Sequence, residues 1–204
     1  MRALLSSWVL AAWAWASPGP SLLEEGAHCV AYRAEKVVLF VARSEVVGRN
    51  CDVSAQVLPE VGGLYHIEVN IPLRSFRSGD TDRDQDIMRV LRAAERSELT
   101  FRSQPLTVDE WKKRFAAADF FVDGQLTIGG HSYPIRLQSH YSEKPAGAEV
   151  DGVAKVRLHD LGISPPRVLG GVVAKAKPDV ELHFHLLSQR ILGADSLRLG
   201  HSGE

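Results

Sequence analysis

Apolar and polar residues alternate along most of this chain. Tyr65, Ile67 and Val69 occupy every second position of one stretch, and polar residues stand between them. Leu182 and Phe184 repeat the pattern near the C-terminus. A period of two places the apolar side chains on one face of a β-strand, so we predict a mainly β protein. Further strands are expected at 30–33, 37–43, 46–57, 99–104, 119–128, 132–141 and 151–158.

A pair of glycines at 129–130 predicts a two-residue turn between two of these strands. Both central residues of a type I′ turn need positive φ, which glycine adopts without a steric penalty. Such a turn places Leu126 opposite Tyr133. Ile128 and Ile135 then fall on the same face, so this hairpin is expected to be half buried.

One segment has the period of a helix instead. Over 84–96 the apolar residues recur at spacings of three and four, which predicts a short amphipathic helix with an acidic start. Residues 109–118 fit either a helical turn or a long hairpin loop. Many strands and one short helix favour a closed antiparallel barrel or a sandwich. An eight-stranded barrel has room for its own side chains or for one small ligand.

The first residues have the pattern of a secretory signal peptide. Arg2 precedes a mainly apolar run, and residues 14–16 form an A-x-A cleavage site. A membrane anchor needs about 20 apolar residues, and this run is shorter. No later stretch is apolar enough to span a membrane, so we expect a periplasmic or secreted protein. The predicted organisation is a signal peptide over 1–16, a linker over 17–28, one barrel domain over 29–187 and a polar tail over 188–204.

Charge and motifs exclude several classes of function. With 24 basic and 25 acidic residues, the chain lacks the excess of positive charge typical of a nucleic-acid binder. It has no Gly-x-Ser-x-Gly motif and no glycine-rich loop that opens a helix after a strand. We therefore predict no catalytic residues.

Two cysteines, Cys29 and Cys51, lie beyond the predicted cleavage site. In an oxidising compartment they can form a disulfide, which would contribute about 3 kcal/mol on the chain-entropy account. Two separate buried thiols are the equal alternative.

Glu181, His183 and His185 are the strongest candidates for metal ligands. Histidines at i and i+2 share one face of a strand, and imidazole binds zinc or copper well. The opposite face is apolar and is expected to point inward, so these histidines are predicted to face solvent without further ligands. We predict no metal site, and metal binding through His183 and His185 stays the weaker alternative.

Two pairs of motifs stand out in the middle of the chain. Ser-Gly-Asp-x-x-Arg-Asp at 78–84 is followed by Leu-Thr-Phe-Arg-Ser at 99–103. Gly-Gln-Leu-Thr-Ile-x-Gly at 124–130 is followed by Tyr-Pro-Ile-Arg-Leu at 133–137. These motifs resemble the YceI-like, polyisoprenoid-binding family. The resemblance covers roughly 30–187 and implies an extended eight-stranded antiparallel barrel, lipocalin-like in shape. In that family the lumen holds an isoprenoid chain, the proteins are commonly periplasmic, and no catalytic residues are implied.

The chain departs from the family pattern near its charged turn. Asp80 stands where the family usually has Asn, so the identity of the lipid does not carry over. Arg83 has two interpretations. Its planar guanidinium suits a ligand's phosphate or quinone head group at the barrel mouth. Alternatively, Arg83 and Asp84 cap the helix over 84–96 and brace the loop before it.

The apolar face of the barrel is the basis of the functional prediction. A hydrocarbon chain gains about 0.8 kcal/mol per buried CH₂, so an apolar lumen binds it without polar contacts. We predict that the protein sequesters or carries an apolar, polyisoprenoid lipid or a quinone, and needs no other cofactor. The alternative is a ligand-free structural or stress-protective barrel with a packed interior. The oligomeric state is open, with a homodimer as one option. The residues expected to line the lumen are Tyr65, Ile67, Val69, Phe101, Leu126, Ile128, Tyr133, Ile135, Val156, Leu182 and Phe184.

Overall fold

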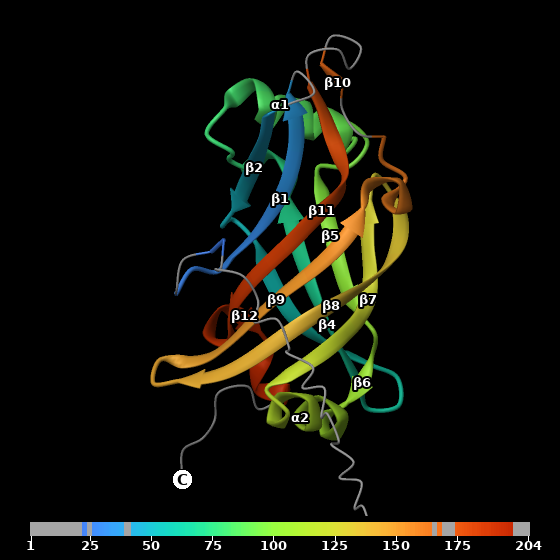
Figure 1. Cartoon of the computed structure of the whole chain (residues 1–204). Helices are drawn as coiled ribbons and strands as arrows, with labels where there is room; N and C mark the ends of the chain where they lie inside the picture. The colour runs from blue at the N-terminus through green and yellow to red at the C-terminus, as the bar shows by residue number, and fades with distance from the viewer. Residues whose placement is uncertain (1–21, 24–25, 39–41, 165–166, 169–173, 198–204) are drawn as a thin grey trace, which may run out of the picture.

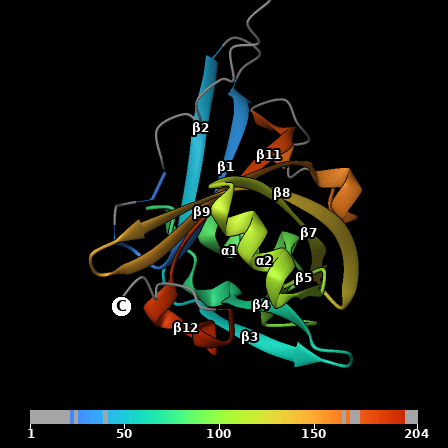
Figure 2. The same ribbon diagram turned by 90° about the horizontal axis from the view of Figure 1, so that it is seen from below.

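A computed structural model describes residues 22–23, 26–38, 42–164, 167–168 and 174–197. One mainly antiparallel sheet curls around an interior, with α1 (Thr81–Val90) at one end and α2 (Val108–Ala116) at the other (Figures 1 and 2). The long strands are β1 (Cys29–Val38), β2 (Ala42–Asn50), β3 (Ser54–Glu60), β4 (Leu64–Pro72), β5 (Glu98–Ser103), β7 (Asp119–Ile128), β8 (His131–Lys144), β9 (Gly147–Arg157) and β11 (Ala174–Leu187). The short strands are β6 (Leu106–Thr107), β10 (Arg167–Val168) and β12 (Ile191–Leu192), and the described 3₁₀ turns are η1 (Leu73–Ser75), η2 (Leu158–Leu161), η4 (Ser188–Arg190) and η5 (Ala194–Leu197).

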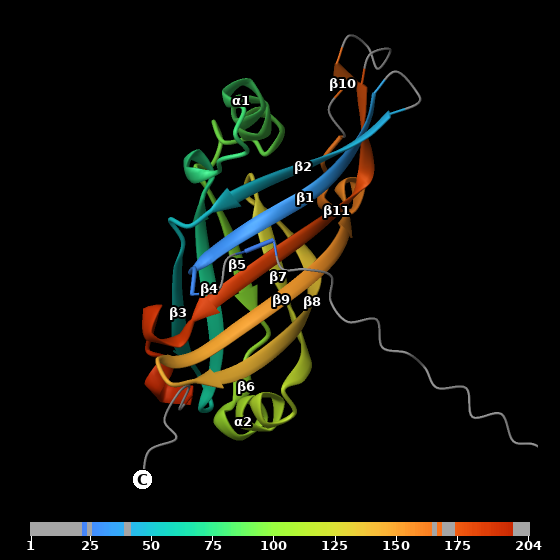
Figure 3. The same ribbon diagram turned by 60° about the vertical axis from the view of Figure 1, so that its left-hand side comes forward.

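The sheet differs from the predicted closed barrel of eight strands. Ten strands follow one another in the order β12-β3-β4-β5-β7-β8-β9-β11-β1-β2, while β6 pairs with β4 and β10 with β11. In the described part of the chain β2 and β3 form no ladder. A ladder needs backbones that run side by side about 4.8 Å apart, whereas these two strands diverge (Figures 2 and 3). Arg49 of β2 instead forms an isolated antiparallel bridge with Arg77, in the segment after η1, with N–H···O distances of 2.9 and 2.8 Å.

The predicted hairpin is confirmed in its turn and its register. Gly129 and Gly130 have φ values of 55° and 82°. Leu126 pairs with Tyr133 across β7 and β8. Ile128 and Ile135 are both buried, as the alternation predicts.

The helix predicted over 84–96 is shifted toward the N-terminus. α1 spans Thr81–Val90, because the Asp80 carboxylate accepts the backbone N–H of Arg83 at 3.1 Å and so caps an earlier start. Arg92 then adopts a left-handed conformation with a φ of 56°, which ends the helical path well before residue 96.

A second helix, α2, forms in the segment for which the sequence left a helical turn or a loop open. Thr107 and Glu110 form a capping box at its start, in which each side chain bonds to the other residue's backbone N–H. Trp111 and Phe115, four residues apart, form its buried face. The prediction of a single helix is therefore wrong.

Residues 188–197 differ from the predicted polar tail. Ile191, Ala194 and Leu197 are buried, and β12 pairs in parallel with β3. These three apolar residues recur at every third position and so share one side of the stretch. The last part of the stretch, η5, contacts α2 and β3. The C-terminal stretch up to Leu197 therefore belongs to the core.

The N-terminal end of the described chain is attached to the outside of the sheet. Cys29 at the start of β1 forms a disulfide with Cys51, just after β2, which decides between the two alternatives left open by the sequence. Leu23, in the expected linker, packs against Cys29 and Ala31. The predicted signal peptide over 1–16 lies outside the described residues. Within the described residues, neither helix is both long and apolar enough to cross a membrane.

Candidate functional site

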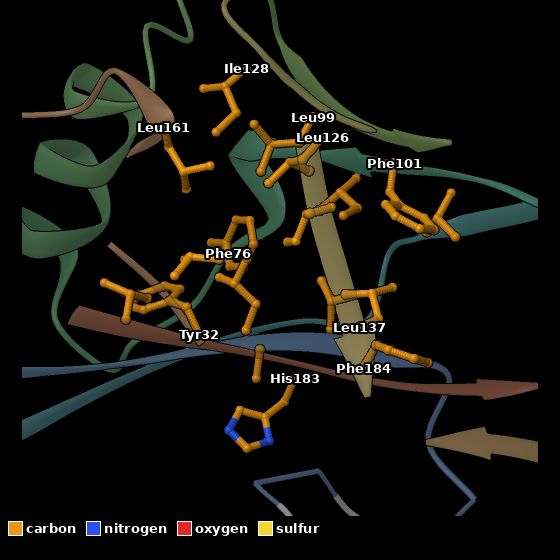
Figure 4. A pocket seen from close by; sticks show the side chains of 18 of the residues that line it. Tyr32, Phe76, Leu99, Phe101, Leu126, Ile128, Leu137, Leu161, His183 and Phe184 are labelled. Atoms are coloured by element: carbon orange, nitrogen blue, oxygen red, sulfur yellow. The ribbon is translucent and has the colours of Figure 1, made fainter. Parts of the chain in front are cut away.

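The curled sheet encloses an apolar cavity of about 510 Å³. Its wall consists mainly of aliphatic and aromatic side chains that point inward from strands across the sheet, as Figure 4 shows for Leu99, Phe101 and Leu137. The alternation along each strand explains this composition, because every second residue faces the interior.

Most of the residues predicted to line the lumen contribute to this cavity. The nine that do so are Ile67, Val69, Phe101, Leu126, Ile128, Ile135, Val156, Leu182 and Phe184. The two tyrosines of the prediction do not. Tyr65 lies beyond the cavity, where its carbonyl accepts a 3.0 Å hydrogen bond from Trp111 of α2. The hydroxyl of Tyr133 lies against Gly162, where an added Cβ would overlap it. Both tyrosines occupy the alternate positions of their strands that were predicted to face inward. Neighbouring segments, however, fill the space beside their side chains.

Aromatic side chains close the end of the cavity at α2. Trp111 is fully buried and stacks on Phe115, with ring centroids 5.7 Å apart. Phe115 also meets Phe120 edge-on at 5.8 Å and stacks on Tyr141 at 5.0 Å. This aromatic end of the cavity was not predicted from the sequence, although a Trp and a Phe four residues apart are the signal of a helix's apolar face.

Charged residues line the opposite end, at α1. They are Glu35, Asp80, Asp82, Arg83 and Asp86. Glu35 was missed because a register shift between Ala34 and Lys36 in the β1–β11 pairing interrupts the alternation there.

Arg83 lies at this end, but its guanidinium pairs with Asp80 at 3.0 Å. Hydrogen bonds from the Arg83 backbone and side chain also hold the pKa of Asp80 below its usual range. Asp84 accepts bonds from the N–H and the hydroxyl of Ser78, at 2.9 and 2.6 Å. These contacts brace the loop before α1, as the second interpretation expected, but the helix is capped by Asp80, and Arg83 and Asp84 lie within its first turn.

Tyr32 is a further residue at the α1 end, and it was not among the predicted lining residues. Its ring packs beside Phe76, with centroids 5.7 Å apart (Figure 4), and a Cβ on its strand partner Gly48 would overlap it. Its hydroxyl is buried beside the Ser78 side chain. Burial, assisted by the Asp84 carboxylate, raises the pKa of Tyr32 to about 12, so it stays a neutral hydrogen-bond donor.

The histidines of β11 are less exposed than predicted. His183 is half-buried, and Figure 4 shows its ring beyond the ribbons of β1 and β11, directed away from the apolar side chains. His185 is only 4% exposed because His28 and the disulfide lie beside it. The Nδ1 atom of His185 lies 2.5 Å from Asp151 Oδ1. No group of three potential metal ligands occurs in the part of the chain that the structure describes.

Comparison with known proteins identifies the family. The family description "YceI-like domain" matches residues 30–187. The chain belongs to the YceI-like family. The resemblance seen in the motifs at 78–84 and 124–130 is therefore confirmed. In this YceI-like protein, Ile191 of β12 also lines the cavity, so the interior extends past the matched region.

Two solved structures share the fold of this YceI-like protein. BcnA from Burkholderia cenocepacia is 18% identical, with coverage of 76% of this chain and 94% of that chain and a TM-score of 0.55. A polyisoprenoid binding domain from Saccharophagus degradans, implicated in plant cell wall breakdown, is 15% identical, with coverage of 76% and 91% and a TM-score of 0.54. No curated protein matches the chain.

Proposed function

We propose that this YceI-like protein is an exported binding protein, not an enzyme, that holds an apolar lipid in its cavity. The cavity itself, about 510 Å³ with a mainly hydrocarbon wall, is the observation on which the proposal rests. A ligand-free structural barrel would be expected to fill this space with its own side chains, because protein interiors are close-packed. An open interior of this size therefore favours a carrier or a store.

The size of the hydrophobic effect supports binding without a polar site. At about 0.8 kcal/mol per buried CH₂, fifteen buried carbons would contribute roughly 12 kcal/mol before the costs of association and ordering. Leu126, Ile128 and Leu137, all buried lining residues, offer no polar atom to a ligand. Affinity would therefore increase with the length of hydrocarbon enclosed.

We further propose that the lipid is isoprenoid and that the protein acts outside the cytoplasm. The description of the Saccharophagus degradans domain as polyisoprenoid binding supports the lipid class. The signal-peptide pattern over 1–16 and the Cys29–Cys51 disulfide support export, because disulfides persist mainly in oxidising compartments. The role that follows is to shield a long apolar chain from water during carriage or storage.

Native mass spectrometry tests the proposal on protein purified from its own host after export. We expect a co-purifying lipid and, after delipidation, uptake of tritiated geranylgeraniol. Protein that carries no lipid and takes up no prenyl probe would overturn the proposal.

A pair of neighbouring variants on β8 locates the binding. Leu137 faces the cavity and Gln138 faces outward, so Leu137→Trp fills the lumen whereas Gln138→Trp adds the same ring to the outer surface. We expect probe uptake to fall strongly in the first variant and to persist in the second, with far-UV circular dichroism as the check on folding. Equal uptake by both variants would place the lipid elsewhere.

A further inference from the structure

Three glycines of the sheet lie beneath aromatic rings of the cavity wall. The glycines are Gly48, Gly124 and Gly152, and the rings over them are those of Tyr32, Phe101 and Phe184, which line the cavity. A Cβ on any of these glycines would overlap its ring, because the nearest ring carbon lies well inside the roughly 3.5–4.0 Å of a favourable carbon contact. Each ring therefore occupies the place of a missing side chain on the neighbouring strand.

All three glycines belong to the inner face of the sheet. Gly48 and Gly152 pair directly with the residues whose rings cover them, and residues paired across two strands share a face. Gly124 lies two positions before Leu126, which also lines the cavity. A glycine inside a strand loses backbone entropy and packs no side chain, so it destabilises the strand unless a close approach requires it. Here the rings make that close approach.

Gly152 illustrates how a side chain at these positions would narrow the lumen. Its backbone is paired with β8 on one side and β11 on the other, which leaves it little freedom to move away. A Cβ there would displace the Phe184 ring, and the open space beside that ring is the cavity. The other two pairs join β1 to β2 and β5 to β7, so the same constraint acts at separate places around the pocket (Figure 4).

A wide lumen favours a branched chain over a straight one. Isoprenoid chains have regularly spaced methyl branches, so they are wider than a straight chain with the same main-chain length. Branches that reach the apolar wall gain contacts along it. A straight chain in the same lumen leaves gaps, and atoms beside a gap lose those contacts.

We propose that Gly48, Gly124 and Gly152 are specificity-determining residues that keep the lumen wide enough for methyl-branched chains and thereby favour isoprenoids over straight-chain lipids. This inference rests on the proposed function, because it assigns the residues that select the tail of the lipid that the cavity holds. A side chain at any of the three positions narrows the lumen at its own ring.

Two alcohols that differ only in their branches test this selection. Phytanol is a saturated isoprenoid alcohol, and hexadecanol has the same main chain and head group without the methyl branches. Each is measured on the exported, delipidated protein by displacement of tritiated geranylgeraniol. We expect wild type to bind phytanol several-fold more tightly than hexadecanol. Because additional methyl groups favour phytanol in any apolar site, the deciding comparison is between wild type and variants.

Gly152→Ala should remove the preference for the branched chain. The displaced Phe184 ring takes up lumen volume, so the affinity for phytanol should fall about tenfold and that for hexadecanol less than about twofold. Adding Phe184→Leu to Gly152→Ala should restore phytanol binding, because the smaller side chain leaves the space free. Val153→Ile is the matched control, because it adds one carbon at the next residue of β9, which does not line the cavity.

Gly48→Ala repeats the test without a backbone clash. The three atoms nearest to a Cβ at Gly48 all belong to the Tyr32 side chain, whereas a carbonyl oxygen lies 2.5 Å from a Cβ at Gly124 and 2.9 Å from one at Gly152. Gly48→Ala should therefore fold even if Gly152→Ala does not, with far-UV circular dichroism as the check. We expect the same selective loss of phytanol binding.

The outcomes separate this inference from the proposed function. If neither alcohol binds to wild-type protein, the lipid-binding function itself fails. If both bind but wild type does not favour phytanol, or if the folded glycine variants keep the preference, the role of the glycines is overturned while the function stands. Equal losses for both alcohols would also overturn it, because a narrower lumen should exclude the branched chain first.

Discussion

His28 is expected to make the stability of this protein depend strongly on pH. Its side chain is 1% exposed, and its Nδ1 atom accepts the backbone N–H of Leu187 at 3.1 Å. Burial, followed by the positive charge of Arg190 and by His185, lowers the pKa of His28 from 6.5 to about 4. A proton on Nδ1 would also break the bond to Leu187, because both groups would then be donors.

The magnitude follows from linkage between protonation and folding. The folded-state pKa lies below the unfolded value of 6.5, so the folded state resists a proton that the unfolded chain accepts. The contribution of neutral His28 is therefore complete above pH 6.5 and is lost as the pH falls toward 4. At roughly 1.4 kcal/mol for each factor of ten, this loss amounts to about 3 kcal/mol at pH 4.

Urea unfolding followed by far-UV circular dichroism at pH 7, 5.5 and 4 measures this loss. His28→Gln keeps an acceptor but cannot take up the proton, so its free energy of unfolding should fall by about 3 kcal/mol less than that of wild type between pH 7 and 4. His66 and His183, whose pKa values burial also lowers, remain in both proteins and cancel in this difference. His131→Gln, at an exposed hairpin position, should behave like wild type. Parallel pH profiles for His28→Gln and wild type would refute the reasoning.

Three further predictions concern the elements that hold the cavity together. Replacing both Cys29 and Cys51 by Ser should lower the free energy of unfolding by about 3 kcal/mol, and reduced wild type should match the variant in urea titrations. Trp111→Ala should cost about 3–5 kcal/mol by the same assay, because it empties the cavity floor and leaves the Tyr65 carbonyl unpaired; a loss below 1 kcal/mol would contradict the packing described. Thr107→Ala should cost about 1 kcal/mol through the lost cap of α2, and an unchanged thermal midpoint would argue against that cap.

Local pattern was enough to predict most strands and the side of each that faces inward. The predictions 37–43 and 46–57 were wrong in their bounds, because β1 ends at Val38, β2 spans Ala42–Asn50 and β3 begins only at Ser54. A strand's side chains alternate regardless of what lies around it, so the inward positions of Ile67 and Leu126 follow from residue spacing alone. The turn at Gly129 and Gly130 was equally predictable, because its requirement for positive φ concerns two adjacent residues.

Boundaries were harder, because they depend on single contacts. Asp80 caps α1 so that the helix starts at Thr81, three residues before the predicted start at residue 84, and the capping box at Thr107 starts a helix where the pattern was ambiguous. Residues 188–197 looked polar along the chain, yet Ile191 and Leu197 are buried. In each case a few side chains with specific partners outweigh the average character of the segment.

Alternation and the family motifs thus indicate where most strands lie, which face is buried and which family the chain belongs to. Each of these properties depends on the spacing of residues that are close together in the sequence. The open interior is a different kind of property. It depends on how strongly the sheet curves, on the divergence of β2 from β3, and on α2 closing one end. The same inward leucines and phenylalanines would fill a tighter barrel completely. Burial of His28 and exclusion of Tyr65 from the cavity likewise arise from segments distant in sequence, and no local pattern encodes the space between them.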